Sequence, residues 1–114
     1  MKENTLLIEI DDTSFEHEVL HAPTPVLVCF SAGWCSQCEA MVPVLEELAE
    51  KYEGRIKFLK LDVDANAQSS VKYRVRSLPT LLIFQNGEVV EEITEVLPKH
   101  ALAEILEARS HSEG

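Results

Sequence analysis

The sequence predicts an α/β fold in which helices flank both faces of one mixed central β-sheet. Apolar runs of strand length alternate with segments of helical periodicity, in the order βαβαβαββα. Strands joined through helices favour parallel pairing, whereas the hairpin signal Asn86-Gly87 predicts an antiparallel edge. The 114 residues suffice for one domain. We expect residues 1–109 to form that single domain and residues 110–114 to be a flexible tail.

The N-terminal part of the chain is expected to supply two strands and a short helix. Residues 6–10 form the first apolar run, and the polar run 11–14 offers N-cap residues for a helix that continues to about Leu20. Residues 26–30 are continuously apolar. Such a run is expected of a strand that is buried on both faces.

The next segment predicts the longest helix of the chain. Two apolar stripes at helical spacing run from about Cys35 to Tyr52, with glutamates and a lysine outside them. Pro43 lies within this helix and should kink it, because proline lacks the N–H that the helical ladder needs. Gly54 is the expected C-cap.

The C-terminal half is expected to alternate strands and helices and then close with a helix. Its elements should cover residues 56–63 (strand), 66–73 (short helix), 80–85 and 88–93 (a hairpin of two strands), and 97–106 (closing helix).

The composition excludes several classes of partner. The formal net charge of −10 repels phosphate backbones and anionic lipid surfaces, so we expect neither nucleic acid nor a membrane as partner. The longest apolar stretch, residues 26–30, is far below the ~20 residues of a membrane span. Acidic residues follow the N-terminal apolar run at once, which is untypical of a signal peptide. We therefore expect a cytoplasmic protein.

The cysteines point to redox chemistry. Cys35 and Cys38 form a C-x-x-C at the junction of a buried strand and a helix. Residues three apart on a helix share one face, which brings the two Cα atoms within the range that a disulfide tolerates. The free N–H groups and the positive dipole end of a helix N-terminus stabilise a thiolate. The pair is therefore predicted to be a redox-active dithiol.

Two other interpretations of the pair remain open from the residues alone. The cysteines could be a redox-silent remnant, or they could be half of a zinc site. Zinc needs four ligands, and the chain contains no second C-x-x-C and no H-x-x-H. We expect no metal, and the four histidines are interpreted as ordinary surface or helix residues: His17, His21, His100 and His111.

Several separated motifs in register resemble the thioredoxin family. They are the run 26–38 with its Trp-Cys-x-x-Cys, Pro43 within the helix, and the segments 60–64, 77–80 and 84–88. The resemblance runs without a gap from about residue 26 to residue 107. It implies a thioredoxin fold and a protein-disulfide reductase that needs no cofactor besides its redox-active disulfide. It also implies disulfide-containing protein substrates, an electron donor of the thioredoxin-reductase type, and a monomer.

The resemblance also implies roles for five residues. Cys35 would be the exposed nucleophile that attacks a substrate disulfide, and Cys38 the resolving thiol. Trp34 would shield the pair and contribute to substrate docking. Pro79 matches the family's cis-proline opposite the disulfide. Leu78 before it would offer backbone groups to an extended substrate segment.

The chain departs from the family pattern at the active site. Ser36 and Gln37 replace the usual Gly-Pro between the cysteines, which should loosen the reduced loop and leaves the redox potential open by tens of millivolts either way. Cys29 replaces the buried acid beneath the disulfide, and Lys60 resembles the lysine near that acid. Cys29 is either a small core hydrophobe or a partner for Cys38 in an alternative disulfide.

Three further departures surround the pair. Ser31 replaces an aromatic residue, Glu39 stands where a basic residue is common, and Glu95 replaces a glycine of the docking surface. The two glutamates would oppose thiolate formation and favour basic partners, or they belong only to a solvated acidic face.

Two alternative functions remain compatible with the sequence. One is a binding or chaperone-like module on the same fold with weak redox activity. The other is a reductant dedicated to one partner. Reduction of a model disulfide by the chain and by a Cys35→Ser variant distinguishes the first alternative, because a binding module would show equal rates. Failure of a thioredoxin reductase to reduce the cysteine pair would support the second.

Overall fold

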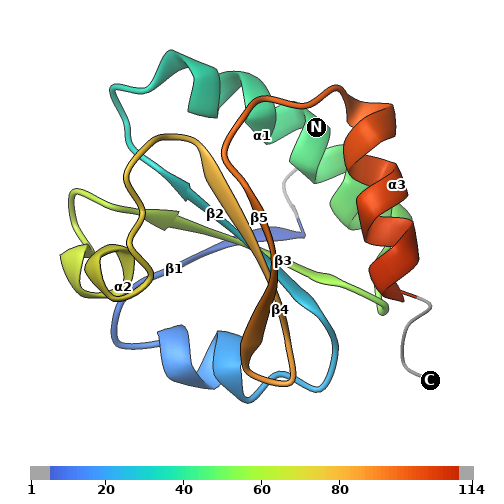
Figure 1. Cartoon of the computed structure of the whole chain (residues 1–114), viewed down its shortest axis with the longest axis horizontal. Helices are drawn as coiled ribbons and strands as arrows, with labels where there is room; N and C mark the ends of the chain where they lie inside the picture. Colours follow the sequence, from blue (N-terminus) through green and yellow to red (C-terminus); the bar gives the residue numbers. More distant parts are fainter. Residues whose placement is uncertain (1–5, 111–114) are drawn as a thin grey trace.

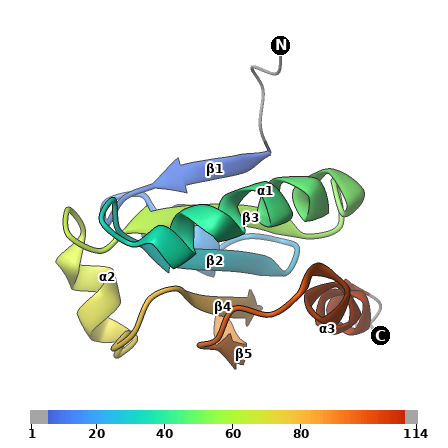
Figure 2. The same cartoon turned by 90° about the horizontal axis from the view of Figure 1, so that it is seen from above.

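Five strands form one mixed sheet in the computed structural model, which describes residues 6–110 (Figure 1). The strands are β1 (Leu7–Ile10), β2 (Val26–Ser31), β3 (Lys57–Asp62), β4 (Thr80–Gln85) and β5 (Glu88–Ile93). Their spatial order is β1-β3-β2-β4-β5, which Figure 2 shows from one sheet edge to the other. β3 pairs in parallel with β1 and β2, and β4 is antiparallel to β2 and β5. The predicted mixed α/β sheet is confirmed.

Helical elements cover both faces of this sheet. They are η1 (Glu16–Leu20), α1 (Ser36–Lys51), α2 (Ala67–Lys72) and α3 (Lys99–Ser110). α1 and α3 pack on one face, while η1 and the segment after α2 pack on the other (Figure 1). α3 includes Ser110, the first residue of the predicted tail, and residues 111–114 lie outside the described part of the chain.

The alternation of side chains along β2 explains its continuous apolar sequence. Val28 and Phe30 belong to the core beneath η1, whereas Leu27 and Cys29 belong to the core beneath α1 and α3. All six residues of β2 are buried. A central strand covered by helices on both sides has no solvent-facing side, so it requires apolar residues at every position. This burial fixes β2 and thereby the loop that follows it.

Two turns depend on a backbone in the left-handed region. Asn86 and Gly87 have φ of 55° and 81°, as the predicted two-residue hairpin requires. Gly54 has φ of 83° but lies two residues beyond Tyr52, where α1 is capped. Its turn lets the N–H groups of Arg55 and Ile56 both donate to the Tyr52 carbonyl. The predicted C-cap was therefore misplaced by two residues.

The polar run before η1 does not cap that helix, contrary to the sequence-based expectation. The Asp11 carboxylate instead closes a turn of its own by accepting the Ser14 N–H at 2.9 Å and the Thr13 hydroxyl at 2.7 Å. Phe15 stands at the N-cap of η1, without a side-chain hydrogen bond. The polar side chains of this run form hydrogen bonds within their own turn instead of with the first N–H groups of η1. Sequence spacing alone does not distinguish these two arrangements.

Candidate active site

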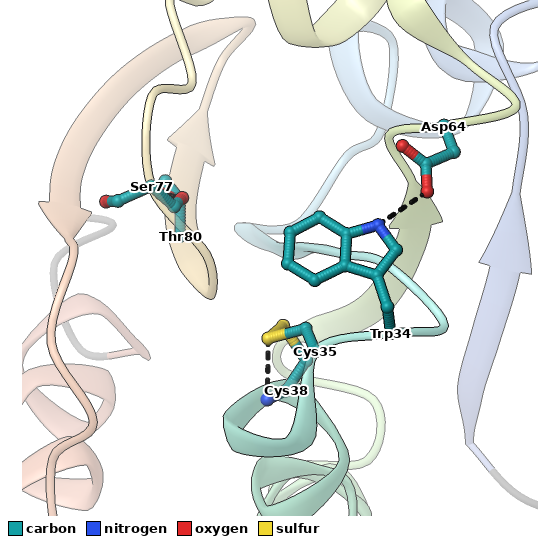
Figure 3. Close-up of a disulfide and its surroundings, with 6 residues drawn as sticks. All are labelled: Trp34, Cys35, Cys38, Asp64, Ser77 and Thr80. Atoms are coloured by element: carbon teal, nitrogen blue, oxygen red, sulfur yellow. Dashed lines mark hydrogen bonds between the residues drawn. A yellow bond between two sulfur atoms is a disulfide. The ribbon is translucent and has the colours of Figure 1, made fainter.

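The junction between β2 and α1 places the two cysteines at a helix N-terminus. Cys35 is the N-cap of α1, with an extended backbone at φ −95° and ψ 104°. Its Sγ accepts the backbone N–H of Cys38 at 3.1 Å (Figure 3). The Cys35 sulfur thus takes the place of a capping oxygen, in the positive field of the helix dipole. This is the position that the sequence predicted.

The two cysteines form a disulfide, and both are largely covered. Their Cα atoms are 5.2 Å apart, within the range that disulfides tolerate. Cys35 is 7% exposed and Cys38 is 2% exposed. Cys35 is therefore the more exposed residue of the two, but both are buried, so the expected exposure of Cys35 is not seen.

Trp34 lies beside the disulfide, and its indole ring is held by the carboxylate of Asp64, which lies two residues after the end of β3. Trp34 is 71% exposed, and its Nε1–H donates to Asp64 Oδ2 at 2.8 Å (Figure 3). The Asp64 N–H in turn donates to Asp62 Oδ1 at 2.8 Å. The sequence reasoning did not single out Asp64. The available signal was that neighbouring parallel strands end at the same edge, which brings the segment after β3 next to the segment after β2.

The loop before β4 completes the surroundings of the disulfide. The Leu78–Pro79 peptide bond is cis, the isomer that the family resemblance implies. Leu78 is half-buried and packs against the cluster of Ala32, Cys35 and Cys38. The structure thus brings three segments together at one edge of the sheet: the cysteine turn, the end of β3 and the cis-proline loop.

Cys29 lies in the core rather than in the cysteine cluster. It is 0% exposed in the centre of β2 and pairs in register with Lys60 on β3. Burial raises its pKa from the ordinary 9.0 to about 12, although the positive charge of Lys60 opposes the shift. The Cys29 thiol is therefore protonated at neutral pH. Its burial fits a small core hydrophobe, and an alternative disulfide with Cys38 stays a hypothesis.

A polar cavity of about 120 Å³ lies beside Cys38. Its lining includes Cys38 and Glu39 from the start of α1, Ser31 from β2, and Lys60 and Asp62 from β3. The sequence analysis named the segment 60–64 but did not identify Asp62 as a site residue. Strand register supplies the signal, because Ser31 pairs with Asp62 two residues after Cys29 pairs with Lys60 on the same face.

The remaining predicted site residues are exposed. Ser36 and Gln37 form the first turn of α1, and Glu39 follows in the same turn. Glu95 lies in the loop between β5 and α3, and within residues 6–110 no hydrogen bond or ion pair ties it to the cysteines. The structure thus places Glu39 at the cavity beside Cys38 and leaves Glu95 without a described contact to the disulfide.

The described residues contain neither a metal-binding cluster nor a helix that could cross a membrane. Among residues 6–110 no group of three or more histidine, cysteine, aspartate or glutamate side chains is arranged to hold a metal ion. In the same part of the chain, no helix combines the length and the apolar character that crossing a membrane requires.

Comparison with known proteins points in one direction. Residues 6–108 match the family model described as thioredoxin. The chain is 44% identical over 101 residues to thioredoxin C-2 of Corynebacterium nephridii, covering 89% of this chain and 94% of that protein. It is 42% identical over 99 residues to thioredoxin 1 of a Nostoc species, covering 87% and 92%, respectively. It is also 42% identical over 102 residues to a thioredoxin of Pseudomonas aeruginosa, covering 90% and 94%.

Proposed function

The chain belongs to the thioredoxin family and is a thioredoxin-like dithiol–disulfide oxidoreductase, and from this premise we propose how its residues divide the reaction. Cys35 is the nucleophile and Cys38 is the resolving thiol. The observation that carries this assignment is the position of Cys35 as the N-cap of α1, where its sulfur accepts the Cys38 N–H. The greater exposure of Cys35 supports the same order.

The reaction proceeds in two exchange steps. The Cys35 thiolate attacks one sulfur of a substrate disulfide, which forms a mixed disulfide and releases the other substrate sulfur as a thiolate. The Cys38 thiolate then attacks the Cys35 Sγ and expels the second substrate sulfur. The substrate gains two electrons and two protons, and the enzyme is left with its Cys35–Cys38 disulfide. A helix N-terminus favours the thiolate of Cys35 both as attacking and as leaving group.

Substrate docking uses the surface around the disulfide. Trp34 offers an exposed aromatic surface that Asp64 holds in place through the indole N–H. Leu78, which precedes the cis bond to Pro79, packs against the cysteine cluster. We assign its backbone groups to pairing with an extended substrate segment, in the manner of a short added strand.

The partners and the setting form the finer part of the proposal. The substrates are proteins with accessible disulfides, and a reductase of the thioredoxin-reductase type supplies the electrons. The disulfide itself is the redox centre, so the reaction needs no bound cofactor. We place a monomeric protein in the cytoplasm, where thiols are kept reduced. Cell fractionation tests the location, and light scattering of the purified protein tests the monomer.

Reduction of insulin by dithiothreitol tests the catalytic roles. The wild-type chain should accelerate it, and Cys35→Ser should abolish the acceleration because no nucleophile remains. Cys38→Ser, reduced and then freed of dithiothreitol, should accumulate a mixed disulfide between Cys35 and the substrate when it is mixed with insulin, which mass spectrometry detects. Cys29→Ala is the matched cysteine control and should still accelerate the reaction. Equal rates for the wild type and Cys35→Ser would contradict the assignment.

A reductase assay tests the electron donor. A bacterial thioredoxin reductase supplied with NADPH should reduce the Cys35–Cys38 disulfide, and consumption of NADPH should require both cysteines. If the reductase fails while dithiothreitol succeeds, the proposed donor is wrong and a donor dedicated to this protein takes its place.

A further inference from the structure

The segment between α2 and the cis-proline loop differs in charge from the rest of the chain. The chain contains twenty acidic residues, yet residues 65–87 contain none, and their charged side chains are all positive: Lys72, Arg74 and Arg76. We call residues 72–76 the basic segment. On a molecule with a net charge of −10, such a segment attracts negative groups that the remaining surface repels.

Alternating burial places the cations on the outer side of the basic segment. Tyr73 and Val75 pack against the core beneath η1, whereas Lys72, Arg74 and Arg76 are exposed. The Val75 N–H also donates to a carbonyl of α2 at 2.9 Å. Because the backbone is anchored in this way, little further ordering of the segment is needed when a partner binds.

The two arginines carry the charge that a partner can use. Among residues 6–110, no salt bridge joins Arg74 or Arg76 to a carboxylate. Lys72 differs, because it lines a cavity together with Asp12 and Glu16, whose carboxylates offset part of its charge. A guanidinium also binds a carboxylate through two parallel hydrogen bonds, which a lysine does not. The arginines are therefore the principal contacts.

The basic segment leads directly into the docking surface around the disulfide. Ser77 follows Arg76, and Leu78, which precedes the cis bond to Pro79, packs against the cysteine cluster. An extended substrate segment advances about 3.3 Å per residue. If one of its residues lies opposite Leu78, the residues two to four positions further along come within reach of the long side chains of Arg76 and Arg74.

We propose that the basic segment binds an acidic run of the partner protein, on one side of the cysteine that Cys35 attacks. The inference rests on the proposed function, because it needs Cys35 as the nucleophile and Leu78 as a docking residue. Arg74 and Arg76 determine specificity by pairing with aspartates or glutamates of the partner, and they take no part in the exchange of bonds.

The charge of the whole molecule and that of the basic segment act at different ranges. The net charge of −10 steers whole molecules at a distance, whereas the two arginines act in contact with the bound segment. A nucleic acid is an extended polyanion, which the surrounding acidic surface repels along its length. A short acidic run meets only the basic segment, so an acidic protein segment fits better than a nucleic acid.

Two peptides of identical composition test the proposal. Each contains one cysteine, joined by a disulfide to an aromatic thiol whose thiolate absorbs visible light, and three aspartates placed either before or after that cysteine. The Cys35 thiolate attacks the peptide sulfur and releases the coloured thiolate. Reduced wild-type protein should react about three- to tenfold faster with one peptide than with the other, as expected for two exposed arginine–carboxylate pairs. The net charge acts equally on both peptides.

Matched variants assign this preference to the basic segment. Arg74→Asn combined with Arg76→Gln should abolish it, and asparagine suits position 74 because Arg74 has a left-handed backbone with φ of 57°. Lys51→Gln combined with Arg55→Gln removes two exposed charges at the other end of α1 and should keep the preference. A peptide with serines in place of the aspartates should react at similar rates with all three proteins, which would demonstrate an intact fold.

The contrary outcomes separate the inference from the proposed function. Equal rates of the wild type with the two aspartate peptides would overturn the inference, as would a preference that survives in the double arginine variant. If the peptide rates are equal and only the wild type binds a single-stranded DNA oligonucleotide, nucleic acid replaces the acidic segment as partner. If Cys35→Ser releases the coloured thiolate as fast as the wild type, the assignment of the nucleophile fails instead.

Discussion

At the scale of single residues, Cys29 makes stability depend on alkaline pH. Its pKa is raised by burial from the ordinary 9.0 to about 12. Because the pKa of Cys29 is higher in the folded state than in the unfolded state, unfolding releases a proton at any pH between these two pKa values. The contribution of the buried Cys29 thiol to the free energy of unfolding is fully present below about pH 9, and it is lost as pH rises toward 12. We expect the free energy of unfolding of the oxidised protein to fall by up to ~1.4 kcal/mol per pH unit above pH 9.

Chemical denaturation between about pH 7 and pH 10 measures this slope. Burial also raises the pKa of Tyr52 from 10.0 to about 12 and raises that of Tyr73, so these two phenols add to the slope as pH approaches 10. The Cys29 thiol dominates the slope in the lower part of the window. In the oxidised chain of three cysteines, Cys29 is the sole thiol. Cys29→Ala should therefore remove most of the slope below pH 10. A variant with the wild-type slope would show that another group titrates.

The two residues between the cysteines tune the redox potential. Ser36 and Gln37 are exposed in the first turn of α1, where proline is tolerated because these N–H groups lack intrahelical partners. Gln37→Pro should restrict the reduced loop more than the disulfide-closed loop. The oxidised form gains relative stability, and the potential should become more negative by roughly 10–20 mV, from ~0.4–1 kcal/mol of lost flexibility. Equilibration with glutathione measures the shift, with Gln37→Ala as control. A more positive potential would contradict this reasoning.

At the scale of elements, strong periodicity made the sequence informative. β2 and α1 were predicted within one or two residues, because a strand buried on both faces and a helix with an apolar stripe have distinct patterns. The hairpin followed from Asn86-Gly87, since both positions need a left-handed backbone. The start of η1 was not predictable in the same way. The Asp11 carboxylate closes a local turn with Thr13 and Ser14, whereas the partners of Asp12 lie on α2 and depend on the tertiary fold.

Asp12 caps a helix that is distant in sequence. Its carboxylate accepts the N–H groups of Gln68 and Ser69, at 3.1 and 2.9 Å, at the start of α2. Asn66, the N-cap residue, makes no side-chain cap of its own and instead accepts the Asp12 N–H. Asp12→Ala should therefore lower the free energy of unfolding by about 0.5–2 kcal/mol, as loss of an N-cap does. Urea denaturation measures the loss.

The pH dependence of this cap has a definite sign. Partial burial opposes ionisation of Asp12, but the hydrogen bonds from Ser69 and Gln68 outweigh it and lower the pKa below 3.8. The stabilisation is therefore present above that value and is lost as pH falls below it. Asp12→Asn retains one acceptor oxygen and should cost less than Asp12→Ala at pH 7. If the wild type and Asp12→Ala have equal free energies of unfolding at pH 7, the carboxylate does not act as a cap.

At the scale of the whole molecule, the site was predictable where its residues adjoin in sequence or share a family motif. Cys35, Cys38 and Trp34 lie in one short run, and Pro79 was reached only through the resemblance. Asp64 and the cavity beside Cys38 were missed, because they depend on the register between β2 and β3 and on how strand ends meet. Sequence periodicity indicates that a strand exists but does not give the residue opposite each position.

The net charge of −10 affects how substrates approach the disulfide. Glu39 lies beside Cys38, and both Glu39 and Glu95 are exposed, so attraction should favour substrates that carry positive charge. For a disulfide peptide with net positive charge, kcat/KM should fall several-fold as salt rises to about 0.2 M, because the Debye length shrinks below ~10 Å. A matched peptide of net negative charge should show the opposite trend. Glu39→Gln combined with Glu95→Gln should flatten both slopes if these two carboxylates contribute locally. If the double variant keeps the salt slopes of the wild type, the effect belongs to the overall charge. If kcat/KM is independent of salt for both peptides, electrostatic steering is refuted.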